Sequence, residues 1–135
     1  MADFKLEVVA PEGKVVGADV QFVKLPSVEG ELGILAHHTP LIGALKVGII
    51  RYTKDEKSYR IATSGGFVEV ANNKVTVLAE TAEPGDLIDL ERALAAKERA
   101  MQRINERNTE SDIKRAEFAL QRAINRIKAA EGTEG

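Results

Sequence analysis

Residues 67–78 have the sequence Phe67-Val68-Glu69-Val70-Ala71-Asn72-Asn73-Lys74-Val75-Thr76-Val77-Leu78. Apolar and polar side chains alternate on both sides of a short polar centre, and alternation with a period of two is typical of half-buried β-strands. The centre, Ala71-Asn72-Asn73-Lys74, has the residue types that close tight turns. The stretch therefore predicts an antiparallel β-hairpin and indicates a β domain around it.

Segments of the same kind surround this hairpin. Further strands are predicted at Phe4–Val8, Asp19–Val23, Ile49–Tyr52 and Tyr59–Ala62. The connectors 11–14 and 54–57 carry turn residues, so we expect the strands to pair antiparallel with their sequence neighbours. About eight to ten short strands at this spacing favour a flattened β sandwich or barrel over a parallel sheet.

The composition changes abruptly at residue 86. All four prolines and nine of the eleven glycines precede it, and the chain from Asp86 to Glu131 contains neither residue type. Asp86 is expected to cap a first helix, and Thr109 or Ser111 to cap a second after a polar break at 106–111. The predicted apolar stripes are Leu87, Leu90, Leu94, Met101 and Ile104 in the first helix, and Ile113, Ala116, Leu120, Ala123 and Ile127 in the second.

Two helices joined by so short a break predict an antiparallel hairpin whose thin core makes it marginally stable alone. The chain is thus expected to be an α+β protein in two parts. A β-sandwich domain at 1–84 would carry assembly, and a regulatory helical hairpin would occupy 85–135.

Composition and missing motifs argue against several functions. The formal net charge of −2 is unsuited to nucleic-acid binding, and the absence of cysteine excludes disulfides and thiolate metal sites. The first residues lack the basic start and apolar core of a signal peptide, and no apolar run approaches the roughly 20 residues that cross a bilayer, so we expect a cytosolic chain without direct membrane insertion.

No phosphate-binding loop or nucleophile elbow is present in the sequence. His37 and His38 stand in a predicted loop before Pro40, and a structural or interface role is favoured over catalysis. We therefore predict a non-catalytic protein with no catalytic residue and no metal site.

The arginines of the second helix suggest binding. Arg122 and Arg126 share a helix face, and neither has a carboxylate three or four residues away. They form either a solvated surface or a site for an anion or an acidic partner. Asp89 and Arg92 share a face of the first helix, as an ordinary salt bridge or as part of that same site, because an antiparallel hairpin brings this end beside Arg122 and Arg126.

Three stretches of the sequence resemble a known family. The run Gly30–Leu41, together with Gly65–Val70 and Val75–Ala79, closely resembles the epsilon subunit of bacterial F-type ATP synthases, and the likeness extends over essentially the whole chain. Ala36 departs from the proline that many relatives carry. The resemblance implies a central-stalk rotor subunit of a proton-translocating ATP synthase, peripheral at the cytoplasmic face of the cell membrane.

The resemblance also implies partners. The β sandwich would bind the gamma subunit and the c-ring. The hairpin would either fold onto the β domain or extend along gamma into the alpha/beta catalytic head and oppose ATP hydrolysis. Since the head is expected to present acidic surface, the inhibitory contacts are assigned to Arg115, Arg122 and Arg126.

A nucleotide-binding subgroup of the family carries the pattern Ile/Leu-Asp-x-x-Arg-Ala. The resemblance therefore implies ATP as a regulatory ligand, alone or with Mg²⁺, and no catalytic cofactor. The residues carried over for ATP binding are Glu83, Ile88, Asp89, Arg92, Ala93, Arg122 and Arg126. The carboxylates would hold the adenine, the ribose or Mg²⁺, the arginines would face the phosphates, and ATP would stabilise the folded hairpin. A free-standing nucleotide-sensing module remains the alternative, and an enzyme acting on nucleotides is disfavoured.

Overall fold

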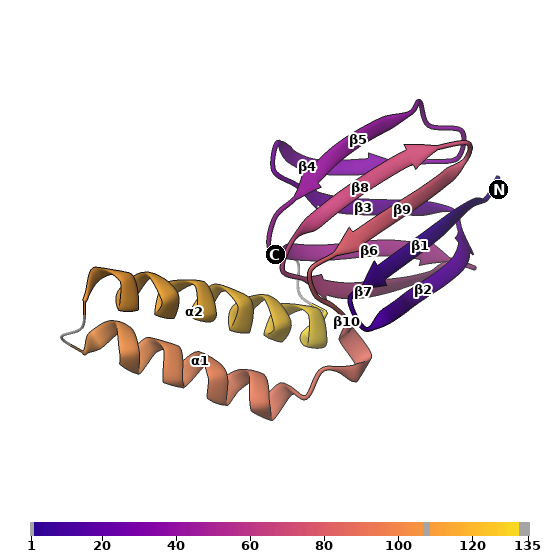
Figure 1. Cartoon of the computed structure of the whole chain (residues 1–135). Coiled ribbons are helices and arrows are strands. Elements are labelled where there is room, and N and C mark those ends of the chain that lie inside the picture. The colour runs from indigo at the N-terminus through magenta and orange to yellow at the C-terminus, as the bar shows by residue number, and fades with distance from the viewer. Residues whose placement is uncertain (1, 107–108, 133–135) are drawn as a thin grey trace.

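The computed structural model describes residues 2–106 and 109–132, and it has two parts (Figure 1). The first part is a β domain, and the second is a helical hairpin that projects from one end of it. The strands are β1 (Phe4–Ala10), β2 (Gly13–Val20), β3 (Phe22–Ser27), β4 (Gly30–Ile34), β5 (Leu41–Leu45), β6 (Gly48–Lys54), β7 (Lys57–Thr63), β8 (Gly66–Ala71), β9 (Lys74–Ala79) and β10 (Ala82–Pro84).

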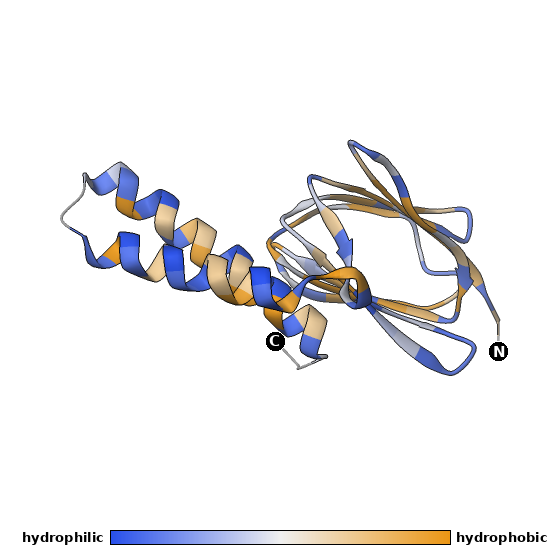
Figure 2. Cartoon of the chain, turned by 90° about the horizontal axis from the view of Figure 1, so that it is seen from below, coloured by the Kyte–Doolittle hydropathy of each residue, from blue (hydrophilic) through white to orange (hydrophobic). Residues whose placement is uncertain are grey.

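The strands form two layers that face each other, as Figure 2 shows from below. One layer contains β10, β7, β6, β3 and β4, and the other contains β5, β8, β9, β1 and β2. The layers are hydrogen-bonded through β3 and β5, where Ser27 is paired with Leu45. The predicted flattened β sandwich or barrel is therefore confirmed.

The core lies between the two layers, and strand alternation fills it. In β1 the side chains of Phe4, Leu6 and Val8 are buried, whereas Lys5 is exposed. The same alternation operates in β8 and β9, where the inward-facing side chains are valines. Each such side chain removes apolar surface from water, which is the main stabilising term of this part.

The predicted turns are confirmed. Asn72 and Asn73 have φ angles of 53° and 59°, and Asp55 and Glu56 have φ angles of 51° and 68°. Two consecutive residues with positive φ form the turn that matches the twist of a two-residue hairpin, and Asn and Asp tolerate this conformation best.

Two predictions about the strands were wrong. The expected strand Asp19–Val23 is two strands, because the chain bends at Gln21 and passes from β2 in one layer to β3 in the other. The Gln21 side chain fixes this corner by donating to Asp3 Oδ1 and accepting from the Asp55 amide, both at 2.8 Å. Pairing is also not confined to antiparallel neighbours, since β1 pairs parallel with β9.

The helical part consists of a short 3₁₀ turn, η1 (Gly85–Leu87), and two helices, α1 (Leu90–Asn105) and α2 (Glu110–Glu131). The predicted cap at Asp86 was wrong. Asp89 is the N-cap of α1, and its carboxylate accepts from the Arg92 amide at 3.2 Å. The start is displaced because Ile88 is extended and buried in the joint with the β domain.

The second predicted cap is confirmed at Thr109, which accepts from the Asp112 amide at 3.3 Å. Residues 107 and 108 of the predicted polar break, and residues 133–135 of the predicted hairpin domain, lie outside the described residues.

The helices form the predicted antiparallel hairpin, but alanine fills the seam between them. Ala93 and Ala100 of α1 and Ala116 and Ala123 of α2 are buried. Leu87, the first member of the predicted stripe, lies in η1 and not in α1. The larger members within α1 are more exposed, with Leu94 at 44% and Met101 at 40%. Small side chains allow a close approach of the helices, which pushes larger neighbours to the edges of the seam.

Candidate functional site

The hairpin meets the β domain at the end of α2 and the beginning of α1. An apolar cluster fills this joint and contains Ile49, Ala62, Ile88, Ala93 and Ala129. Ile49 and Ala62 belong to strands β6 and β7 of the β domain, whereas Ala93 and Ala129 belong to α1 and α2, so the complete cluster exists only while the hairpin is folded against the domain. Its side chains are mostly small, so it buries little apolar surface compared with the core of the sandwich.

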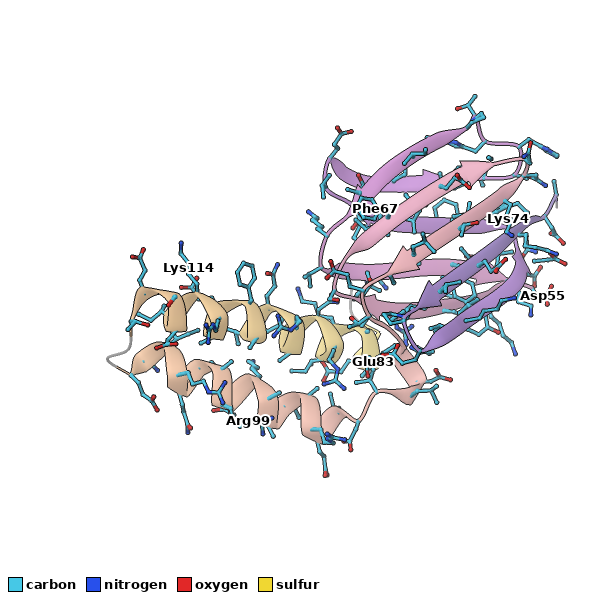
Figure 3. The ribbon with its side chains drawn as sticks, viewed as in Figure 1. Asp55, Phe67, Lys74, Glu83, Arg99 and Lys114 are labelled. Carbon is cyan, nitrogen blue, oxygen red and sulfur yellow. The ribbon has the colours of Figure 1, made fainter. Side chains whose placement is uncertain are left out.

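An ion pair crosses the same joint. Arg126 Nε lies 2.8 Å from Glu83 Oε1, and Arg126 Nη2 donates to Glu83 Oε2 at 3.1 Å. Glu83 belongs to β10 and lies where the end of α2 meets the β domain (Figure 3). The carboxylate thus contacts two nitrogens of the guanidinium group. Within the described part of the chain only Nη2 forms a hydrogen bond, because the short contact of Nε does not lie along its N–H direction.

Beside this ion pair lies a cleft of about 310 Å³. It is lined by Val47, Ala62, Thr63, Ser64, Thr81, Glu83, Ala96, Ala119, Arg122, Ala123, Asn125 and Arg126. The apolar part of the wall is mostly alanine, and the charged part consists of one carboxylate and two guanidinium groups. Both parts of the chain contribute, because β7, β10, α1 and α2 each supply residues.

The cleft brings together three of the seven residues predicted to bind ATP, namely Glu83, Arg122 and Arg126. Arg122 is exposed and has no ion pair or hydrogen bond in residues 2–106 and 109–132. The carboxylate that the local sequence does not offer Arg126 comes instead from a strand 43 residues earlier.

The remaining four residues lie outside the cleft wall. Ile88 and Ala93 are buried in the apolar cluster of the joint, with exposed fractions of 9% and 0%. Asp89 serves as the N-cap of α1, and the Arg92 side chain is exposed. All four stand at the beginning of α1, beside the end of α2 that carries Arg126.

Two residues that sequence analysis overlooked tie the joint together. Asn125 Nδ2 donates to Gly48 O at 2.7 Å and to Thr63 O at 3.4 Å, and Arg60 Nε donates to Ala129 O at 2.9 Å. A polar Asn125 between Ile124 and Ile127 was a signal, because an amide on the inward face of a helix needs a partner. Nothing in the sequence around Arg60 marks its contact.

A larger groove of about 690 Å³ shares only Val47 and Asn125 with the cleft. It runs between β3, β6 and α2, and its wall includes Lys24, Lys46 and Lys128. None of the predicted site residues lines it, so its greater size does not make it the better candidate.

The other predicted residues are also placed. Arg115 is exposed on α2 and lines neither hollow described above. His37 and His38 lie in a loop, where the His37 amide donates to Asn73 Oδ1 at 2.7 Å and His38 Nδ1 lies 2.7 Å from Thr39 O. Among the residues that the structure describes, no group of three His, Asp or Glu side chains could hold a metal ion.

Comparison with known proteins identifies the family. The model of the ATP synthase delta/epsilon chain β-sandwich domain matches residues 3–85, and that of the long α-helix domain matches residues 86–131. ATP synthase epsilon chains of Desulfitobacterium hafniense and Desulforamulus reducens are 58% and 54% identical over 127 residues, which are 94% of this chain and 96% of each relative. That of Bacillus velezensis is 48% identical over 130 residues, or 96% of this chain and 98% of the relative.

Solved structures share the fold. A chain of the mitochondrial ATP synthase of Euglena gracilis matches with a TM-score of 0.81 and 24% identity, covering 98% of this chain and 81% of that one. A chain of the Tetrahymena thermophila central stalk and c-ring matches with a TM-score of 0.62 and 15% identity, covering 93% and 95%.

The matches to the three epsilon chains cover at least 94% of this chain and at least 96% of each relative, so the similarity concerns the complete two-part architecture rather than one domain. The chain belongs to the family of ATP synthase epsilon chains, which are non-catalytic subunits of the central stalk. No helix within the described ranges is long and apolar enough to span a membrane.

Proposed function

We propose that this chain is a rotor subunit of a proton-translocating ATP synthase, peripheral at the cytoplasmic face of the cell membrane. Its β domain binds the gamma subunit and the c-ring. Its hairpin extends into the alpha/beta catalytic head to oppose ATP hydrolysis, and ATP holds the hairpin folded. The family membership supports the first role, and the composite cleft between the two parts supports the second.

The single observation that carries the regulatory proposal is the origin of the cleft wall. Arg122 and Arg126 come from α2, whereas Glu83, Ser64 and Thr81 come from the β domain. The wall therefore exists only when the hairpin is folded. A ligand that binds one state alone stabilises that state by RT ln(1 + [L]/Kd), or about 2.7 kcal/mol at a hundredfold excess over Kd. This is enough to shift the population of a marginally stable hairpin.

The charges of the cleft suit a nucleotide with its phosphates on the arginine side. Arg122 is free to donate to phosphate oxygens, whereas Arg126 is engaged by Glu83 in the folded state. Arg126 is partly neutralised by Glu83, so a phosphate must compete with this carboxylate for the guanidinium. Mg²⁺ bound to the phosphates would then interact with Glu83 in place of the Arg126 guanidinium group.

The beginning of α1 completes the proposed site. Arg92 is exposed and can turn toward the phosphates, and Asp89 already uses one carboxylate oxygen as a cap. Ile88 and Ala93 do not pack against the adenine base, because both side chains are buried in the joint. In this proposal they hold the beginning of α1 in place.

An apolar face of the β domain supports the assembly role. Ile42, Phe67 and Leu78 are 78%, 61% and 57% exposed, and they lie on the adjacent strands β5, β8 and β9. Phe67 stands on the outer side of this sheet (Figure 3). Exposed apolar area on a subunit of a permanent complex marks a protein interface, and we assign this face to gamma.

The test is calorimetric titration of the full chain with ATP and Mg²⁺. Arg122→Gln and Arg126→Gln each remove one charged donor, so roughly tenfold weaker binding or more is expected. Asp89→Asn is preferable to Asp89→Ala, because asparagine keeps the helix cap and removes only the charge. Lys114→Gln, at the far end of α2, is the matched control and should bind as the unaltered chain does (Figure 3).

Two outcomes contradict the proposal. One is the absence of ATP binding by the unaltered chain, and the other is unchanged affinity in both arginine variants. Weaker binding in Asp89→Ala alone, with normal binding in Asp89→Asn, assigns Asp89 to the helix cap and removes its charge from the site.

A further inference from the structure

Among the described residues, the main contacts between the hairpin and the β domain lie at one end of the hairpin. The last turns of α2 contact β6, β7 and η1, and the opposite end of the hairpin points away from the β domain (Figure 1). The apolar residues at the joint are mostly alanine, so their burial provides a limited part of the docking energy. The polar contacts at this end therefore have a large share in deciding whether the hairpin stays folded.

Arg60 binds the terminus of α2. Its Nε donates to Ala129 O at 2.9 Å, and Ala129 lies in the last turn of a helix that ends at Glu131. Carbonyls of a last turn have no partner within their helix, and the negative end of the helix dipole favours a cation there. Gly132 is left-handed, with a φ of 78°, and lies so close that a Cβ on it would be 3.1 Å from Arg60 Cζ. The end of α2 thus wraps around the guanidinium group.

Asn125 makes the reciprocal contact one turn earlier on α2. Its amide group donates to Gly48 O and, over a longer distance, to Thr63 O. Gly48 and Thr63 are paired across β6 and β7, at the end of that ladder. Asn125 therefore satisfies carbonyls at the ladder end, and Arg60 satisfies a carbonyl at the helix end. Since residues 125 and 129 are four apart, both contacts lie on one face of α2.

We propose that Arg60 and Asn125 form a polar latch that sets the folded population of the hairpin in the absence of any ligand. Both side chains donate to backbone carbonyls, so both bonds depend on where the two backbones lie. Water can replace each bond when the hairpin leaves, which keeps the latch reversible, whereas a large apolar joint would not open readily. Only the consequence for ATP binding rests on the function proposed above.

The latch also positions the proposed ATP site. Asn125 lies between Arg122 and Arg126 on α2 and lines the same cleft. With the latch closed, Arg126 is paired with Glu83 and Arg122 lines the same cleft. The apparent dissociation constant for a ligand of the folded state is the intrinsic constant divided by the folded fraction. Loss of the latch therefore weakens ATP binding in proportion to the folded population that is lost.

The experiment measures folding of the hairpin without ATP. The chain has no cysteine, so spin labels on Lys5→Cys and Lys114→Cys report one distance between the β domain and the far end of the hairpin. Arg60→Gln and Asn125→Ala should each raise the ratio of open hairpin, which has left the β domain, to folded hairpin. The increase should be roughly tenfold for Arg60→Gln, which removes a charged donor, and smaller for Asn125→Ala. Hydrogen exchange in the last turns of α2 detects the same change when the open state is rare.

Matched controls are available on the same elements. Lys57→Gln removes an exposed charge from β7, and Gln121→Ala removes an exposed amide from α2, and neither should alter the ratio. An unchanged ratio in both latch variants overturns the latch, as does faster exchange throughout β1 and β9, which indicates general destabilisation. If the latch variants open but the unaltered chain binds no ATP, the latch stands and the proposed regulation by ATP falls.

Discussion

Gly85 allows the close approach of the hairpin to the β domain, and Gly85→Ala is the sharpest test of that geometry. A Cβ on Gly85 would lie 2.5 Å from Ala129 O and 3.2 Å from Ala129 C, whereas ordinary contacts begin at 3.4 Å. Both neighbours are backbone atoms of α2, so no side chain can turn aside. The φ of Gly85 is one that alanine adopts without strain, so the effect of the substitution is steric.

The size of the effect follows from the overlap. The end of α2 must withdraw by about 0.9 Å to relieve the contact with Ala129 O. Arg60 bonds the same carbonyl oxygen at 2.9 Å, and an equal lengthening takes this bond to a distance at which it no longer contributes. Overpacking of this kind costs about 1–3 kcal/mol, which is roughly a 5- to 150-fold shift toward the open hairpin.

The assay is the spin-label distance between residues 5 and 114, measured without ATP. Gly43→Ala is the control, because its Cβ would lie 3.5 Å from Val68, an ordinary contact, in a strand away from the joint. A distance distribution for Gly85→Ala that equals that of the unaltered chain contradicts a steric role of Gly85 in docking the hairpin. So does a structure of the variant in which Arg60 still binds Ala129 O.

Three further predictions concern the two parts separately. A chain ending at Gly85 should fold and bind gamma, because the sandwich has its own core, and Phe67→Ser in that chain should weaken co-purification with gamma; loss of folding on truncation would contradict this. Replacing the three arginines of α2 assigned to inhibition by Gln should raise ATP hydrolysis by the assembled enzyme without loss of assembly, and unaltered hydrolysis would count against an electrostatic contact. A hydrogen bond from Lys74, aided by nearby lysine charges, lowers the pKa of Glu7 below its usual 4.5. The stabilisation that ionised Glu7 gives is present above pH 4.5 and should disappear as the pH falls through the lowered pKa. Urea unfolding of Glu7→Gln should therefore show a smaller decrease in the free energy of unfolding over the same fall in pH.

Local features of this fold were predictable from the sequence, and distant pairings were not. The turn at Asn72 and Asn73 was predictable, because those residue types tolerate the positive φ that the turn requires. The parallel pairing of β1 with β9 joins segments about 70 residues apart, and no local pattern specifies it. The same holds for the partner of Arg126, since the local sequence shows only that the nearest carboxylate is missing.

The candidate site divides in the same way. The beginning of α1 was recognisable as a pattern of residue types, but its displaced start depends on the burial of Ile88 against strands β6 and β7. Asp89 therefore has a structural task, as the helix cap, that the pattern alone could not separate from ligand binding. The role of Arg60 could not be predicted, because its partner is a backbone carbonyl and every residue has one, so the sequence does not indicate which carbonyl accepts.

Arg126 connects the two proposed roles of the hairpin, because one guanidinium group cannot serve both at once. In the folded state Arg126 is paired with Glu83 and lines the cleft proposed to bind the phosphates. In the extended state it would have to leave Glu83 and meet an acidic surface of the catalytic head. In this proposal ATP and the catalytic head compete for the same donor, and the ion pair between Arg126 and Glu83 favours the folded hairpin even without ligand. Glu83→Gln should shift the hairpin toward extension and strengthen inhibition at low ATP, whereas Arg126→Gln should weaken ATP binding and inhibition together. Hydrolysis measured in the assembled enzyme over a range of ATP concentrations separates these results, and equal effects of the two substitutions would contradict competition for a shared donor.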